Sequence, residues 1–427
     1  MTAASVLEPN VPGDAPGDLP ARRTPWLSGV AIFLAVMAPL LAYLAPLGFA
    51  PLLALVGFLA MPGLRLTRAA APPLLILVAL ALWAAVSMTW TPLAIDPSKL
   101  KDYGDIESLT ALKLFLQLAT YGAAVVALRG LSDAGARRGA TVLAYGSVAL
   151  AVVAAADSLS GAAIYQKLYA LTGEVIRPDL AMVKVSLSTY VMALLVWPVA
   201  LILSRRFQPR LIWLLAAGMI TTSVICSSDA CLVALAAGGL VWLMVNTFGR
   251  PAAKVLVGLV AAPFVLAPLV VLVGVETGLI AWLHRLVPAS WDSRLNIWTF
   301  AAHHIQSHPF RGWGLDASRT FGPAIPLHTH NAQLQFWLEL GAIGAALAGV
   351  FFCWLAYGVV RLCDRSRSEA AMAGAALVSY LVIGGLSFGV WQEWWLALGA
   401  LTLIACGLAR AVAKPPWADL DELTPLN

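Results

Sequence analysis

The chain has 427 residues, of which 60% are hydrophobic and 11% are charged. Soluble domains carry about 25% charged residues, so this composition excludes a soluble globular protein and predicts that the chain lies in lipid. The net charge of +5 does not indicate nucleic acid, because membrane proteins carry an excess of Lys and Arg on one side of the bilayer. Residues 1–26 are rich in Pro, Gly and Asp and predict a disordered tail without a cleavable signal peptide.

A helix that spans the bilayer needs about 20 apolar residues. Twelve segments meet or approach this length, which predicts an all-α polytopic membrane protein with about twelve transmembrane helices. Nine of them fall within residues 27–277 and three within residues 332–411, before a second tail at residues 412–427. The segments lie near residues 27–46, 48–63, 73–90, 109–128, 140–157, 181–203, 211–226, 229–247, 255–277, 332–359, 371–389 and 393–411.

The distribution of basic residues predicts the topology. If the N-terminus is cytoplasmic, 17 of the 27 Lys and Arg residues fall in the tails and in the cytoplasmic connections, which agrees with the positive-inside rule. Both termini are then predicted to be cytoplasmic. The 17 residues are Arg22, Arg23, Arg65, Arg68, Arg129, Arg137, Arg138, Arg205, Arg206, Arg210, Arg250, Lys254, Arg361, Arg365, Arg367, Arg410 and Lys414.

The opposite face carries two connections of medium length, residues 91–108 and 158–180, and a long one, residues 278–331. A loop of this length is uncommon unless it is functional or disordered, and this one is not of low complexity. All histidines of the chain lie in it, which confines the groups that titrate near neutral pH to one external loop. They are His284, His303, His304, His308, His328 and His330.

The spacing of apolar residues predicts an amphipathic helix over residues 291–308 that lies on the membrane surface. Asp292 or Ser293 is expected to cap its start, and Pro309 ends it. Arg294 lies in the first turn, where it is either an interface anchor with a snorkelling side chain or a functional group. The apolar residues are Leu295, Trp298, Ala302 and Ile305.

The motif H-T-H-N ends the loop directly before the tenth predicted span, and Asn331 or Thr329 can cap that helix. A helix N-terminus attracts anions, so His328, His330 and Asn331 predict a phosphate or oxyanion site. Zinc binding by the two histidines lacks a third ligand nearby. No P-loop, H-E-x-x-H or Asp-rich metal motif occurs, and neither a metal nor a cofactor is predicted.

Polar residues continue into the tenth span. Asn331, Gln335 and Glu339 share one helix face, where such side chains are functional candidates or form hydrogen bonds between helices. For Glu339 the nearby Gly341 favours close helix packing. Before this helix, P-F-R-G-W-G at residues 309–314 predicts tight turns.

Residues at other external helix ends complete the set of candidates. Arg177 and Lys184 flank the sixth predicted span, and Lys184 has no acidic neighbour within four residues. Cations of this kind can hold a diphosphate without a metal. Trp391, Trp394 and Trp395, around the start of the last span, predict an aromatic belt at the membrane interface.

Together these motifs resemble the bacterial O-antigen ligase and polymerase family over residues 293–344. The family pattern is an Arg followed four residues later by Trp, a Pro-x-x-G-x-G turn, a His-x-His-Asn sequence and a Glu-x-Gly helix. A further family feature, a Ser-Arg-Gly-like turn, corresponds to residues 227–230, where the Arg is absent. The matching residues are Arg294 with Trp298, Pro309 with Gly312 and Gly314, His328 to Asn331, and Glu339 with Gly341.

The resemblance implies a GT-C-like membrane glycosyltransferase that is metal-independent and inverting and has its large loop in the periplasm. Such an enzyme moves a preassembled glycan from undecaprenyl diphosphate, in the inner membrane of a Gram-negative bacterium, to a sugar of lipid A–core. We expect His330, or else His328, to act as general base. The residues expected to bind the diphosphate or substrate are Arg294, Lys184, Arg177, Asn331, Arg311 and Gln335.

Three other functions stay open. An O-antigen polymerase uses a second lipid-linked glycan as acceptor, and a protein O-oligosaccharyltransferase uses a protein serine. A transporter or flippase belongs to a different class and predicts internal repeats and charges in mid-span. No convincing repeat is found, and charges in mid-span are scarce.

Overall fold

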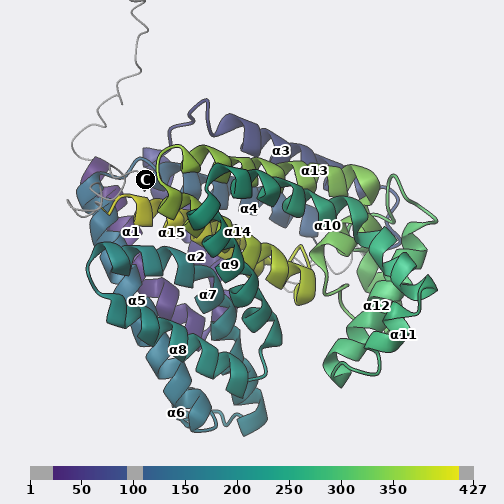
Figure 1. Ribbon diagram of the computed structural model, residues 1–427, viewed down its shortest axis with the longest axis horizontal. Helices are drawn as coiled ribbons and strands as arrows, with labels where there is room; N and C mark the ends of the chain where they lie inside the picture. Colours follow the sequence, from purple (N-terminus) through teal and green to yellow (C-terminus); the bar gives the residue numbers. More distant parts are fainter. Residues whose placement is uncertain (1–22, 94–108, 413–427) are drawn as a thin grey trace, which may run out of the picture.

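The computed structural model describes residues 23–93 and 109–412, and its regular elements in these ranges are helices (Figure 1). Ten described helices are long and apolar enough to cross a membrane, and two apolar helices of 17 residues lie at two other predicted segments. The all-α polytopic membrane fold is therefore confirmed, while the exact number of spans and the domain division stay predictions. The tails and most of the connection at 91–108 lie outside the described residues.

The long helices begin and end within a few residues of the predicted segments, except that α5 starts seven residues earlier. The first six are α1 (Arg23–Leu44), α2 (Phe49–Ala60, between η1, Pro46–Gly48, and η2, Met61–Gly63), α3 (Ala71–Ser87), α4 (Thr110–Leu128), α5 (Asp133–Leu159) and α7 (Pro178–Arg205). The others are α8 (Pro209–Ile225), α9 (Asp229–Phe248), α10 (Arg250–Glu276), α13 (Ala332–Cys363), α14 (Arg367–Leu386) and α15 (Glu393–Arg410). Short helices in the connections are α6 (Ala163–Ala170), α11 (Leu279–Leu283), α12 (Ala289–Ile305), η5 (Ala317–Thr320) and η6 (Gly322–Ala324).

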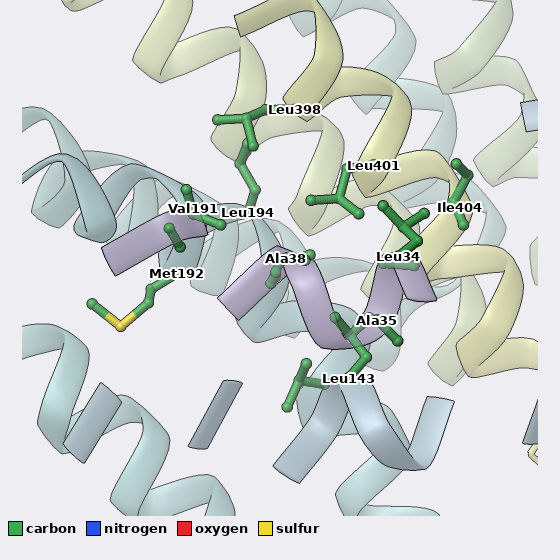
Figure 2. Packing of buried hydrophobic residues seen from close by; sticks show 14 of the residues in the cluster. Leu34, Ala35, Ala38, Leu143, Val191, Met192, Leu194, Leu398, Leu401 and Ile404 are labelled. Atoms are coloured by element: carbon green, nitrogen blue, oxygen red, sulfur yellow. The ribbon is translucent and has the colours of Figure 1, made fainter. Parts of the chain in front are cut away.

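The largest core lies where α1, α5, α7 and α15 meet (Figure 2). Leu34 and Ala38 of α1, Leu143 of α5 and Leu401 of α15 are buried there together. Lipid tails are as apolar as these side chains, so close packing and not the hydrophobic effect holds such helices together. Small residues bring the backbones near: a Cβ on Gly146 of α5 would lie 2.8 Å from a ring carbon of Pro39 in α1.

The second half of the molecule is arranged around α13, which lies between α3 and α10 and also contacts α12 and α14 (Figure 1). The loop helices α11 and α12 lie at one end, beside α10. The expected loop helix is therefore present, but it starts at Ala289 after Pro288, and neither Asp292 nor Ser293 is its N-cap. Asp292 instead contacts His284, with 2.6 Å between Oδ1 and Nδ1.

The apolar face of α12 does not lie on lipid, which corrects the prediction of a surface helix. Leu295, Ala302 and Ile305 are at most 4% exposed. Ala302 and Ile305 pack in a cluster with Val271 of α10 and Leu334 of α13. The three- and four-residue spacing of the apolar side chains identified the buried face of α12. This spacing is the same whether that face packs against lipid or against protein. Because α12 packs against α10 and α13, the position of Arg294 is tied to theirs.

A break divides α13 at Gly341, whose φ of 65° and ψ of −165° are not helical. The turn at residues 309–314 fills the gap. Its N–H groups of Trp313 and Gly314 donate to the carbonyls of Leu338 and Glu339 at 2.8 and 2.7 Å. In return the N–H of Ala342 donates to the Pro309 carbonyl at 2.8 Å. Irregular backbone at membrane depth is tolerated only when its polar groups are paired in this way.

The glycines on both sides of this contact leave no room for a side chain. A Cβ on Gly312 would lie 2.3 Å from the carbonyl oxygen of Glu339, and a Cβ on Gly341 would lie 2.3 Å from the carbonyl of Phe310. Both residues also have positive φ, which L-residues with a side chain rarely adopt. The Pro-x-x-G-x-G and Glu-x-Gly motifs are therefore two halves of one backbone junction.

We predict that Gly341→Ala lowers the free energy of unfolding by about 3 kcal/mol, through backbone strain and overpacking. The measurement is the apparent melting temperature of the purified protein in detergent. Gly358→Ala is the matched control, because Gly358 lies in the same helix with nothing within 4 Å of its Cβ position. Equal melting temperatures for the two variants would show that the junction at Gly341 is not rigid.

Candidate active site

Arg294 lines a small polar cavity of about 50 Å³ at the start of α12. The cavity also contains Tyr190 of α7, Asp229 at the start of α9, and Ser387 after α14. The guanidinium lies over the ring of Trp291, with 5.0 Å between Cζ and the ring centroid. Residues far apart in the chain thus converge on one cation.

The guanidinium of Arg294 is half-buried and forms no hydrogen bond or ion pair with any other described residue. Burial lowers the pKa of Arg294, but an arginine still stays charged near neutral pH. A desolvated cation without a hydrogen-bonded partner is unfavourable, so this cavity suits an anion. The carboxylate of Asp229 is turned to Trp291, whose indole N–H donates to Oδ2 at 3.3 Å.

His330 presents one free ring nitrogen. Its backbone is in the left-handed region, with φ of 52°, directly before the helix cap. Nδ1 lies 2.9 Å from the carbonyl oxygen of Ser387, so this nitrogen carries the proton and donates it. Nε2 therefore holds the lone pair, and no hydrogen bond to it is formed within residues 23–93 and 109–412.

His328 has both ring nitrogens occupied. Nδ1 accepts the backbone N–H of His330 at 3.1 Å, and Nε2 lies 3.1 Å from Nε2 of Gln392. The carbonyl oxygen of the same Gln392 amide is buried and has no partner. Rotating this amide by half a turn lets His328 Nε2–H donate to that oxygen, which satisfies both groups. Both nitrogens of His328 are thus engaged by the fold, whereas its role as the base stays a prediction.

Burial and neighbouring charge keep both rings neutral. Burial, followed by the proximity of His330, Arg319 and Arg294, lowers the pKa of His328 to about 3. Burial also lowers the pKa of His330, and Arg294 adds to this effect against the opposing hydrogen bond to Ser387. Arg294 and His330 also meet at Ser387, which lines the cavity of Arg294 and accepts the hydrogen bond from His330.

Asn331 and Gln335 are occupied by the fold. Oδ1 of Asn331 accepts the N–H of Leu334 at 2.9 Å, which is the helix cap expected from the sequence. Oε1 of Gln335 accepts the N–H of Val390 at 2.9 Å. Both polar atoms of the Gln335 amide are thus engaged, since Nε2 also donates to Glu339. In Asn331 only Oδ1 is engaged, and its role in substrate binding stays a prediction.

Glu339 is fully buried, and its carboxylate accepts four hydrogen bonds. Oε1 accepts from Ser318 Oγ at 2.5 Å and from Gln335 Nε2 at 3.0 Å. Oε2 accepts from the Asp316 N–H at 3.0 Å and from the Trp391 indole N–H at 2.5 Å. These contacts support a structural role for Glu339. Its hydrogen bonds join the external loop, α13 and the turn between α14 and α15.

The other candidate cations lie outside the cavity of Arg294. Arg177 is exposed and forms an ion pair with Asp179 two residues later. Arg311 is exposed beside the break in α13, with Cζ 5.7 Å from the ring centroid of Trp90. Lys184 is exposed on α7, six residues before Tyr190, or about 9 Å along the helix axis.

Three residues of the site were not identified from the sequence: Tyr190, Ser387 and Gln392. Tyr190 lies in an apolar helix without a motif around it. Ser387 and Gln392 flank the turn between α14 and α15, where the chain leaves the helix after Leu386. The only available signal was the cluster of Gly, Gln and Ser in this turn. Trp394 and Trp395 are at most 6% exposed, so they belong to the core and not to an aromatic belt.

The chain matches known proteins over the part that holds the loop and the break. Residues 214–349 match the family model described as O-antigen ligase. Over this segment, about a third of the chain, the sequence is similar to the O-antigen ligase family. The segment contains Asp229, Arg294 and both histidines of the H-T-H-N motif, whereas Tyr190, Ser387 and Gln392 lie outside it.

Curated relatives of the O-antigen ligase segment occur in Rickettsia. The chain is 33% identical over 138 residues to a protein of Rickettsia conorii and 32% identical over 138 residues to one of Rickettsia typhi, both named as proposed polysaccharide ligases. A Rickettsia bellii protein with such a name is 33% identical over 139 residues. Each match covers 29% of this chain and 32% of the relative, so the chain spans about a third of the length of these relatives.

We predict that Glu339→Gln lowers the free energy of unfolding by about 3 kcal/mol, because an amide cannot accept all four of these hydrogen bonds. The apparent melting temperature in detergent is the measurement. Asp364→Asn is the control: Asp364 is exposed and pairs with Arg250 at 3.0 Å, and such surface pairs contribute less than about 1 kcal/mol. A Glu339→Gln protein as stable as the control would contradict a structural role.

Proposed function

We propose that this protein is an O-antigen ligase of the inner membrane of a Gram-negative bacterium. It transfers a preassembled glycan from undecaprenyl diphosphate to a sugar of lipid A–core. The match of residues 214–349 to the O-antigen ligase family model supports the reaction class. The bias of 17 of 27 basic residues to one side supports cytoplasmic termini, and therefore a reaction at the periplasmic face.

The observation that carries the proposal is the half-buried guanidinium of Arg294 in a cavity lined by Ser387, whose carbonyl oxygen accepts the Nδ1–H of His330. A diphosphate leaving group develops negative charge as its bond to the sugar breaks. A preorganised cation in a partly desolvated cavity stabilises that charge. The planar guanidinium can do so through two parallel hydrogen bonds. Lys184 and the more distant Arg177 and Arg311 are secondary candidates for the same diphosphate.

His330 serves as the general base. The acceptor hydroxyl oxygen attacks the anomeric carbon from the side opposite the diphosphate, and its proton passes to Nε2 of His330. The bond between the anomeric carbon and the diphosphate oxygen breaks, and the electron pair leaves with undecaprenyl diphosphate. One displacement inverts the anomeric configuration. The Nδ1–H bond to Ser387 sets the tautomer that leaves Nε2 free.

We predict that His330→Ala lowers kcat by about 10²- to 10⁴-fold, as is usual when a general base is removed. His328→Gln is the matched comparison, because it changes a histidine two residues away whose nitrogens are both occupied. It should lower the melting temperature and reduce kcat less than tenfold. Wild-type turnover by a folded His330→Ala protein would contradict the assignment of the base.

The pH dependence follows from the lowered pKa of His330. The base is active when neutral, so activity is lost as pH falls through the pKa of His330 in the protein. Since this pKa lies below the usual 6.5, we predict that the acid limb of kcat/KM lies below pH 6.5. A limb above pH 6.5 in the wild type would contradict the tautomer and burial described for this ring.

Arg294→Lys tests bidentate binding. It keeps the charge and removes the planar pair of donors, so we predict about a tenfold or larger rise in KM for the lipid-linked donor. Arg285→Lys is the control, because Arg285 is exposed in the same loop. Unchanged KM in Arg294→Lys would argue against a two-point contact to phosphate.

The reaction itself is assayed with purified protein, polyprenyl-diphosphate glycan and lipid A–core. Joined glycan on lipid A–core supports the ligase. Chain extension on the carrier indicates a polymerase, glycan on a serine peptide indicates a protein O-oligosaccharyltransferase, and movement of the donor across vesicles without transfer indicates a flippase. Activity that survives EDTA supports a metal-free mechanism, and activity abolished by EDTA contradicts it.

A further inference from the structure

An apolar groove of about 680 Å³ lies between α1, α5 and α6, away from the cavity of Arg294. Leu40 and Leu44 of α1, Val153 of α5 and Leu168 of α6 contribute to its walls. All four of these side chains are partly or fully exposed to the surroundings of the protein. In a membrane such a groove faces lipid. Which lipid it binds therefore depends on the headgroup that the residues at its ends can bind.

The end of the groove near the start of α5 is polar and basic. Arg137, Thr141 and Tyr145 follow one another at four-residue intervals, so they lie on one face of α5. Thr141 and Tyr145 line the groove. Arg206, at the end of α7, donates from Nη2 to Oγ1 of Thr141. A stripe of guanidinium, then hydroxyl, then hydrocarbon therefore runs from this end into the groove.

The guanidinium of Arg206 is only partly used. Its Nε is buried and has no hydrogen-bond partner among the described residues. Neither Arg206 nor Arg137 forms an ion pair within the described part of the chain. Arg138 and Arg210 add positive charge at this end of the groove. Asp133, one turn before Arg137, offsets one of these charges. The half-buried guanidinium of Arg206 thus lies beside excess positive charge, which is complementary to an anionic oxygen.

The length of the groove matches one lipid chain. From Thr141 to Val153 the helix rises about 18 Å. One leaflet of the hydrocarbon core is about 15 Å thick. A chain that starts at the arginine-rich end would therefore reach the middle of the bilayer without leaving the groove.

We propose that this groove binds an anionic glycerophospholipid of the leaflet at the arginine-rich end. Its phosphate lies between Arg206 and Arg137, and its ester oxygens lie near the hydroxyl of Tyr145. The Thr141 hydroxyl donates to the Arg137 carbonyl and accepts from Arg206, so it orients Arg206 and does not donate to the lipid. One acyl chain fills the groove along α5. The site is separate from Arg294 and His330, so it holds whether or not the proposed ligase activity is correct.

The test is native mass spectrometry of the delipidated full-length protein, titrated with dioleoyl phosphatidylglycerol or dioleoyl phosphatidylcholine. These lipids share their chains and differ in net charge. Each arginine near an anionic headgroup contributes roughly fivefold in affinity, so two predict about a 25-fold preference for phosphatidylglycerol. Arg206→Gln should reduce the preference about fivefold, and the double variant with Arg137→Gln should abolish it. Arg361→Gln, an exposed arginine of α13, should leave it unchanged.

A second pair of variants tests the chain. Ala149→Trp places a large side chain on a residue that lines the groove, and it should weaken binding of both lipids about tenfold or more. Val152→Trp is the control, since Val152 is exposed on α5 but does not line the groove. Equal affinity for the two lipids in the wild type, or an unchanged preference in Arg206→Gln, would overturn the proposal. In a competition experiment, undecaprenyl phosphate that displaces phosphatidylglycerol at a lower concentration than that of the bound lipid would also overturn the proposal. That result would assign the groove to the isoprenoid carrier.

Discussion

The buried carboxylate of Glu339 is the interaction on which the candidate site depends. It lies two residues before the break in α13 and accepts hydrogen bonds from the external loop, from its own helix and from the turn after α14. A carboxyl group buried in a membrane protein is unfavourable unless its oxygens are engaged in hydrogen bonds. Here four donors engage it, and each of them is thereby fixed in place. The break at Gly341 supplies a second link, because the backbone of residues 309–314 replaces the missing helical hydrogen bonds.

The two histidines obtain their different properties from these anchored segments. Trp391, which donates to Glu339, and Gln392 belong to the same short turn, and Gln392 occupies His328. Ser387 begins that turn, and its carbonyl determines the tautomer of His330. Two identical side chains, two residues apart, are thus distinguished by the direction of their hydrogen bonds and not by their chemistry. One becomes part of the framework, while the other keeps a lone pair for a proton.

Local features of this protein were predictable from the sequence, and contacts across the chain were not. Apolar period and length located the long helices, and the cap at Asn331 followed from its position before an apolar run. The buried face of α12 was identified too, but whether it meets lipid or protein depends on where α10 and α13 lie. Tyr190 carries no local signal, and Ser387 is marked only by the Gly, Gln and Ser of its turn, because the importance of both comes from helices that are distant in sequence. For the same reason the burial of Trp394 and Trp395 was missed.

The absence of an arginine at residues 227–230 acquires a physical meaning in the structure. Asp229 lies at the cavity of Arg294, so the turn that carries a cation in the family pattern does face the candidate site. Here it contributes a carboxylate, and that carboxylate accepts a hydrogen bond from Trp291 beneath the guanidinium. The negative charge partly offsets Arg294 and orients the ring over which it lies. A second phosphate contact would then come from another helix end. Lys184 lies on the helix that also carries Tyr190, about 9 Å nearer its N-terminus, so it can supply this contact only to a donor that extends along the helix beyond the cavity.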